Sequence, residues 1–172
     1  GRTNPEIIAV YWGEDRHSDE EIAAMADRKE EVFREILRAD FPAMAGVGEL
    51  LRSLDEAGFA LAVGSSGPPE NIELVIHRLR ARELFEAVVT GMDVTRGKPD
   101  PEIYLTAAER FGLPPHATVV LEDSANGCLA ASAAGAYTVA VPGAHSRDQD
   151  FSSASLVVES LADRRLYEAL GC

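Results

Sequence analysis

Residues 119–127 constrain the fold of this chain more than any other stretch. An apolar run at 119–121 is typical of a buried strand, and it ends in the adjacent carboxylates Glu122 and Asp123 before Ser124 opens a helix. In a parallel sheet this edge binds ligands, and two adjacent carboxylates repel each other unless a cation lies between them. Oxygen ligands of this kind favour Mg²⁺, whereas an exposed acidic turn is the alternative for the pair taken alone.

Composition narrows the class of protein. The chain has 172 residues, 46% of them hydrophobic, which is enough for one core domain and a small appendage. A net charge of −13 opposes a phosphate backbone, so nucleic-acid binding is not expected. No apolar run reaches membrane-spanning length, and the first residues lack a signal-peptide pattern. Two cysteines give neither a disulfide framework nor a metal spacing, and we therefore expect a cytoplasmic protein.

The amino-terminal quarter is predicted to be helical. Asn4-Pro5 is a good helix start, and a capping box of Ser18 and Glu21 opens a long helix that ends near Ala39. Lys29 falls near the centre of the apolar stripe of this helix. Its stem could pack along apolar surface with the ammonium in water, or it could be a cation held over an anionic substrate from a lid.

Beyond Pro42 the sequence alternates between helices and short apolar strands. The expected helices cover residues 47–57, 70–81, 100–111, 124–134 and 160–170, and the expected strands cover residues 59–63, 87–90, 119–121, 137–141 and 156–158. This alternation predicts an α/β fold, in which a Rossmann-like parallel sheet carries helices on both faces and a partial α-helical cap precedes it.

Polar residues follow three successive strands of this predicted sheet. Ser65 lies in a Gly-Ser turn before a helix, Lys98 lies in the next strand-to-helix loop, and Glu122 and Asp123 end the third strand. Each signal alone is weak, because such turns often bind nothing and loop lysines are usually solvated. Together they predict a site in which a hydroxyl and an ammonium hold a phosphate while carboxylates hold Mg²⁺.

These motifs resemble those of a known family. Residues 61–66, 97–101 and 121–124 with Gly127 are similar to the second, third and fourth motifs of the haloacid dehalogenase superfamily, and more narrowly to its β-phosphoglucomutase-like branch of sugar-phosphate phosphatases and mutases. Arg28-Lys29 resembles the Arg-Lys pair of that branch's helical cap. The resemblance implies that Lys29 reaches from the cap to a small phosphorylated metabolite.

The resemblance also implies roles in the core. Ser65 would bind the transferring phosphoryl group, assisted by the backbone of Ser66, and Lys98 would stabilise its charge and orient the nucleophile. Asp123 would ligate Mg²⁺, and Glu122 would ligate it or hold its waters. The implied reaction is hydrolysis through a phospho-aspartyl intermediate.

The sequence departs from the family at its catalytic motif. No Asp-x-Asp pair of the kind that supplies the nucleophile occurs, and the family's first strand lies between the strands that end at Ser65 and Glu122. We therefore expect residues 1–41 to form a helical cap that is incomplete at its N-terminus, and residues 42–172 to form a core domain without its first, central strand. A preceding segment would supply that strand and the nucleophile.

A second departure concerns the substrate. β-Phosphoglucomutases carry an Arg in the first cap loop where this chain has Asn4, with Arg2 close but offset. Both residues are candidates for substrate binding, and the difference favours a phosphatase over a mutase. Two other classes stay open, namely a catalytically inactive protein that binds phosphate and metal, and a receiver-type signalling domain. The oligomeric state does not follow from the sequence.

Overall fold

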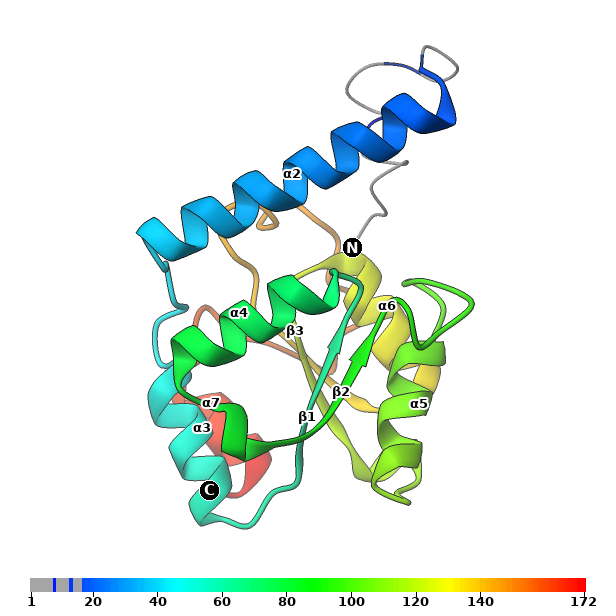
Figure 1. Cartoon of the computed structure of the whole chain (residues 1–172). Coiled ribbons are helices and arrows are strands. Elements are labelled where there is room, and N and C mark those ends of the chain that lie inside the picture. Colours follow the sequence, from blue (N-terminus) through cyan, green and yellow to red (C-terminus); the bar gives the residue numbers. More distant parts are fainter. Residues whose placement is uncertain (1–7, 9–12, 14–16) are drawn as a thin grey trace.

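A computed structural model describes residues 8, 13 and 17–172 of the chain as an α/β fold (Figure 1). The helices are α2 (Asp19–Ala39), α3 (Val47–Glu56), α4 (Pro69–Leu79), α5 (Glu102–Arg110), α6 (Ala125–Ala134) and α7 (Arg164–Leu170). The strands are β1 (Leu61–Ser65), β2 (Phe85–Thr90), β3 (Val119–Glu122), β4 (Tyr137–Ala140) and β5 (Leu156–Val157). Among the described residues, no helix is both long enough and apolar enough to cross a membrane. The predicted fold class is confirmed.

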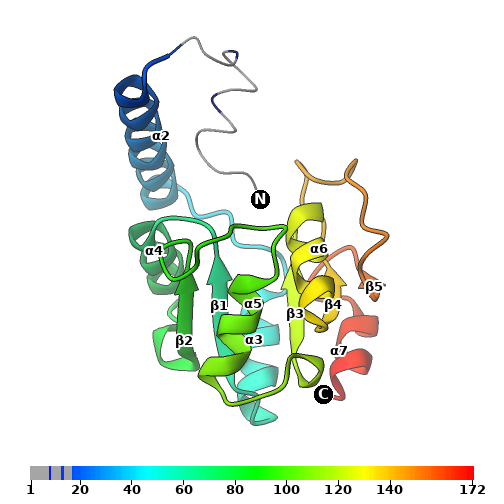
Figure 2. The same ribbon diagram turned by 90° about the vertical axis from the view of Figure 1, so that its right-hand side faces the viewer.

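The strands form two parallel ladders. β1 pairs with β2, and β3, β4 and β5 pair in that order. Figure 2 shows the ladders side by side, with β1 next to β3 and with the strands pointing the same way. In the part of the chain that the structure describes, β1 and β3 share no backbone pairing. The carboxyl ends of the two ladders therefore meet at one edge.

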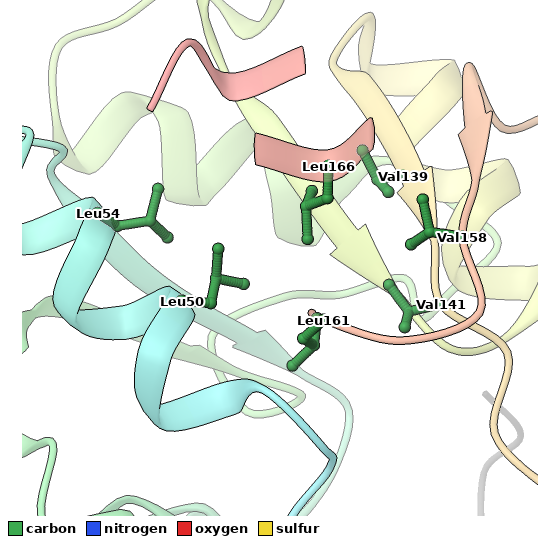
Figure 3. Close-up of a cluster of buried hydrophobic side chains, with 7 residues drawn as sticks. All are labelled: Leu50, Leu54, Val139, Val141, Val158, Leu161 and Leu166. Carbon is green, nitrogen blue, oxygen red and sulfur yellow. The ribbon is translucent and has the colours of Figure 1, made fainter. Parts of the chain in front are cut away.

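Helices pack on both faces of the ladders (Figure 1). On one face, Leu50 and Leu54 of α3 and Leu166 of α7 pack against Val139 of β4, and Figure 3 shows these side chains pointing toward one another. On the other face, α5 and α6 pack against β2 and β3 through a separate apolar cluster. Its buried members are Val89, Ile103, Tyr104, Ala130, Ala131 and Ala134. The small alanine side chains of α6 thus allow this helix to lie close to the sheet.

Helix α2 stands apart from these layers and lies beside α4, beyond the carboxyl ends of the strands (Figures 1 and 2). Its capping box forms as predicted, because the Glu21 amide donates to Ser18 Oγ at 3.3 Å and the Ser18 amide donates to Glu21 Oε2 at 2.8 Å. The apolar stripe is less buried than its pattern suggests, since Phe33 is 42% and Ile36 57% exposed. The buried residues of α2 are Leu37 and Glu30.

Several element boundaries differ from the sequence prediction, and at two of them a local contact gives the reason. β1 begins at Leu61 rather than at Phe59, because the Phe59 amide donates to Leu54 O and so closes the turn after α3. Helix α7 begins at Arg164 rather than at residue 160, because Asp163 caps it by accepting a hydrogen bond from the Arg165 amide at 2.9 Å. In both places a local hydrogen bond decides where the regular element starts.

The core packing predicts the effect of truncating Leu166, whose side chain is fully buried. Replacing Leu166 with Ala leaves a cavity, and we expect the free energy of unfolding to fall by about 2–5 kcal/mol in urea denaturation. Leu113, which is 42% exposed, is the matched control, and its replacement with Ala is expected to change the same quantity by less than about 1 kcal/mol. Equal losses in the two variants would contradict this assignment of the core.

Candidate active site

A cavity of about 1150 Å³ opens at the carboxyl ends of the strands, between the two ladders and α2. The predicted core residues all line it, namely Ser65, Ser66, Lys98, Glu122 and Asp123. Lys29 lines the same cavity from α2. Residues from four separate elements and loops thus meet in one cleft, as the strand order predicts.

Lys98 and Glu122 form a buried ion pair at the floor of this cleft. Their side chains are 8% and 7% exposed, and the Lys98 ammonium donates to Glu122 Oε1. The same ammonium donates to the carbonyl oxygen of Gly64 at 3.1 Å. Since Gly64 belongs to β1 and Glu122 to β3, one lysine joins the ends of the two ladders.

The Glu122 carboxylate is held from several sides. The Tyr104 hydroxyl donates to Oε1, while the Ser124 hydroxyl and the Asp123 amide donate to Oε2, each at 3.2 Å. Burial by itself raises the pKa of Glu122, but the charge of Lys98 and these hydrogen bonds outweigh burial and place the pKa below its ordinary value. The carboxylate is therefore ionised and fixed in position at neutral pH.

Tyr104 is a member of the site that the sequence analysis missed. Besides its bond to Glu122, its ring lies 4.8 Å from the Lys98 ammonium, a cation–π distance. Burial and the Glu122 charge raise the pKa of Tyr104 above its usual range, so the hydroxyl is a permanent donor. The sequence did contain a signal for Tyr104. This residue lies in the first turn of α5, three residues after Pro101, and that face of the helix turns toward the sheet.

Gly127 explains why the motif after the carboxylates contains a glycine. A Cβ atom at this position would overlap the carboxyl group of Glu122. The first turn of α6 is therefore able to lie directly against the buried carboxylate, and Ser124 caps that helix by accepting a hydrogen bond from the Gly127 amide at 3.1 Å. Glycine at residue 127 therefore leaves the space that the Glu122 carboxyl group occupies.

The turn after β1 is available for an anion. Ser65 Oγ accepts a hydrogen bond from the Gly67 amide at 3.2 Å, which holds the turn that leads into α4. Helix α4 begins at Pro69 without a side-chain cap. A hydroxyl beside the amino terminus of a helix suits a phosphoryl group, because the amides and the helix dipole favour negative charge.

Lys29 faces the cleft from the opposite side. Its ammonium lies 2.5 Å from Glu30 Oε1, and its side chain is 45% exposed. Lys29 and Lys98 are the only two lysines in the 172-residue sequence, and both line this cleft. The cleft thus combines two cations with the carboxylate of Asp123, which is exposed. Arg2 and Asn4, the remaining predicted substrate-binding residues, lie outside the described residues.

The described residues of the cleft do not include an activated nucleophile. Asp93 accepts hydrogen bonds from the amide and hydroxyl of Thr90, each at 2.8 Å, and serves the turn after β2. Cys128 is fully buried, and burial raises the pKa of its thiol to about 11, so the thiol is neutral. None of the chain's four histidines is among the described residues that line the cleft.

The donor atoms fit Mg²⁺ only in part. Among the described residues, no three His, Cys, Asp or Glu side chains gather closely enough to hold a metal by themselves. Asp123 and Glu122 supply two carboxylates at the cleft, and Mg²⁺ is often held by one or two carboxylates together with water and a substrate phosphate. The pair therefore suits this ion when further oxygen ligands come from elsewhere.

A hydroxyl, an ammonium and two carboxylates lie together at the carboxyl edge of parallel strands, an arrangement that suits a phosphoryl group in an α/β protein. Comparisons with known proteins agree with this class. A family profile for haloacid dehalogenase-like hydrolases matches residues 7–135, three quarters of the chain. The chain belongs to this family of enzymes, and the receiver-type alternative is thereby set aside.

Two curated relatives and a solved structure support membership of this family. The chain is 32% identical to protein CbbY of Rhodobacter capsulatus over 84% of its own length, and 34% identical to validoxylamine A 7'-phosphate phosphatase of Streptomyces hygroscopicus subsp. limoneus over 92%. A crystal structure of CbbY from Rhodobacter sphaeroides in complex with phosphate has a TM-score of 0.83 and 29% identity, covering 95% of this chain and 75% of that one. The chain spans 66% and 71% of the two curated relatives.

The contact at Gly127 gives a test of the site's construction. Replacing Gly127 with Ala is expected to push the Glu122 carboxylate from its partners and to lower the free energy of unfolding by about 1–3 kcal/mol. The matched control is Gly48 in α3, where a Cβ atom meets nothing within 4 Å. Its replacement with Ala should leave stability unchanged or raise it by up to about 1 kcal/mol. Chemical denaturation measures the free energy of unfolding of both variants. An unchanged free energy in G127A would contradict the close contact between residue 127 and Glu122.

Proposed function

We propose that this chain forms most of the active site of a Mg²⁺-dependent phosphatase that acts on a small phosphorylated metabolite such as a sugar phosphate. The observation that carries the proposal is the convergence of Ser65, Lys98, Glu122 and Asp123 on one cleft, with Lys29 facing them from α2. The phosphatase relative and the phosphate-bound neighbour support the same chemistry. A cytoplasmic location stays a prediction.

Each residue of the cleft has a role in this proposal. Ser65 donates its hydroxyl to the phosphoryl oxygens, and the amides at the start of α4 add to that charge stabilisation. Lys98 counters the charge of the phosphoryl group and orients the nucleophile from its fixed place beside Glu122. Lys29 holds the substrate from the cap side and helps to close the cleft to water.

Asp123 and Glu122 are the groups that would hold Mg²⁺. Asp123 is exposed to the cleft and is the direct ligand, while Glu122, already bonded to Lys98, ligates the ion or orients its waters. When bound, the ion supplies charge stabilisation to the phosphoryl group. The bonds from Lys98 to Glu122 and to the Gly64 carbonyl oxygen do not depend on the ion, because protein atoms alone make them.

The nucleophile is proposed to be an aspartate on a strand outside this sequence. Two observations support this part of the proposal: the described residues of the cleft lack an activated nucleophile, and β1 and β3 stand next to each other without pairing. A parallel strand between them would satisfy the backbone groups of both edges and would end beside Ser65 and Asp123. The phospho-aspartyl intermediate would form there and be hydrolysed by water.

The test compares this chain with a form extended upstream from its own gene. Both are assayed for phosphate release from sugar phosphates and phosphoglycolate, with Mg²⁺ and with EDTA. We expect Mg²⁺-dependent release by the extended form alone, because that form carries the nucleophile. Turnover by the present chain alone would contradict the assignment of the nucleophile. Conversion of β-glucose 1-phosphate to glucose 6-phosphate without release would favour the mutase alternative, and binding of phosphate without turnover in both forms would favour an inactive binding protein.

A substitution at Ser65 tests the phosphoryl site within the active form. Replacing Ser65 with Ala removes a preorganised donor, and we expect kcat to fall by about 10²- to 10³-fold. Ser132, exposed on the outer side of α6, is the matched control, and S132A should retain full activity. A kcat in S65A equal to that in S132A would exclude Ser65 from the site.

A further inference from the structure

Of the two side chains that α2 buries, Leu37 and Glu30, one is polar. Glu30 is 9% exposed and faces Asn71, which is 7% exposed in the first turn of α4. The Asn71 amide nitrogen donates to Glu30 Oε2 at 2.6 Å. On its other side, Arg34 of α2 donates to Asn71 Oδ1 at 2.9 Å. One amide of the core helix thus engages a carboxylate and a guanidinium of the cap helix.

A buried carboxylate is costly to leave without partners. Glu30 therefore favours the arrangement in which α2 lies on α4, since Asn71 of α4 donates a hydrogen bond to it there. The apolar side chains Phe33 and Ile36 of α2 add little to this specificity because they remain exposed, and Leu37 is the apolar side chain that α2 buries. A hydrogen bond fixes the helix at one register, whereas apolar contact permits sliding.

The two oxygens of Glu30 point to different partners. Oε2 accepts from Asn71, and Oε1 lies 2.5 Å from the Lys29 ammonium. Lys29 lines the cleft together with Ser65 and Lys98. A continuous path of polar contacts therefore runs from the core helix through Glu30 to the cation that faces the phosphoryl site.

A second attachment holds the far end of α2. Arg78 of α4 donates to the Arg38 carbonyl oxygen at 3.2 Å and lies 5.6 Å from the ring of Phe41. Because this attachment is near the carboxyl end of α2, loss of the Asn71 contact would leave the helix tethered while releasing the part that carries Lys29. The contact at Asn71 is therefore suited to control the position of Lys29 and not the attachment of the cap.

We propose that Asn71 is a positioning residue, which fixes Glu30 and through it holds Lys29 over the cleft. This inference rests on the proposed function for the role of Lys29 toward substrate. The structural part, which is the contact between α2 and α4 and the order of the Lys29 ammonium, is independent of that function.

Two variants separate the parts of this path. N71L removes both hydrogen bonds of the amide while keeping its branched shape, and E30Q keeps an amide pair between the helices while removing the charge beside Lys29. E35Q is the matched control, since Glu35 lies on the same helix with its side chain 55% exposed. The double variant N71D/E30Q restores a carboxylate–amide pair between the helices with donor and acceptor exchanged.

The first measurements are hydrogen exchange and NMR, made on the form of the protein that is used for the phosphatase assay. We expect hydrogen exchange of the α2 amides to rise in N71L, and to stay at the parent level in E30Q, in N71D/E30Q and in E35Q. Exchange of β4 and α3 amides reports whether each variant is folded. The ¹⁵N–¹H signal of the Lys29 ammonium, identified by its loss in K29R, should broaden in N71L and in E30Q but persist in E35Q.

Kinetics then test positioning against a merely structural role. In N71L and E30Q we expect KM to rise about tenfold, the factor of one hydrogen bond to a charged group, with kcat changed much less. Unchanged α2 exchange in N71L would overturn the contact, and an unchanged Lys29 signal and KM with raised exchange would overturn positioning. If no form of the protein releases phosphate, the proposed function fails, and the exchange and lysine signals alone decide the inference.

Discussion

The buried ion pair of Lys98 and Glu122 is the interaction on which the rest of this structure depends. It joins the end of β1, through the Gly64 carbonyl, to the end of β3. The two strand ladders share no backbone pairing in the described part of the chain, so this side-chain bridge links them at the edge where the cleft opens. Breaking a buried pair leaves an uncompensated charge, so both residues are constrained together.

The constraint extends to the residues that surround the pair. Tyr104 satisfies the carboxylate from α5, Ser124 satisfies it from the start of α6, and Gly127 leaves the space that it occupies. Residues of two separate segments, in α5 and at the start of α6, are thereby tied to one carboxyl group. The three short motifs of the sequence also meet at this charged centre, because Lys98 contacts both Gly64 and Glu122.

A buried carboxylate also lies where helix α2 meets α4. Glu30 divides its carboxylate between Asn71 of the core and Lys29 of the cleft, so a buried charge fixes how the two parts of the molecule meet. The sequence pattern singled out Lys29 as an unusual residue on this helix, and Lys29 lines the cleft. It did not reveal Glu30, because a carboxylate in a charged helical stretch is normally solvated and only the approach of α4 buries it.

The order of elements and the residues at the strand ends were determined by the sequence, because hydrophobic periodicity and turn residues are local properties. Ser65, Lys98, Glu122 and Asp123 could be assigned to one edge for this reason, since parallel strands bring their carboxyl ends together. The bonding partners depended on tertiary structure. Tyr104, Asn71 and the division of the strands into two ladders follow from contacts between distant segments, and no local pattern records the distance at which such segments meet.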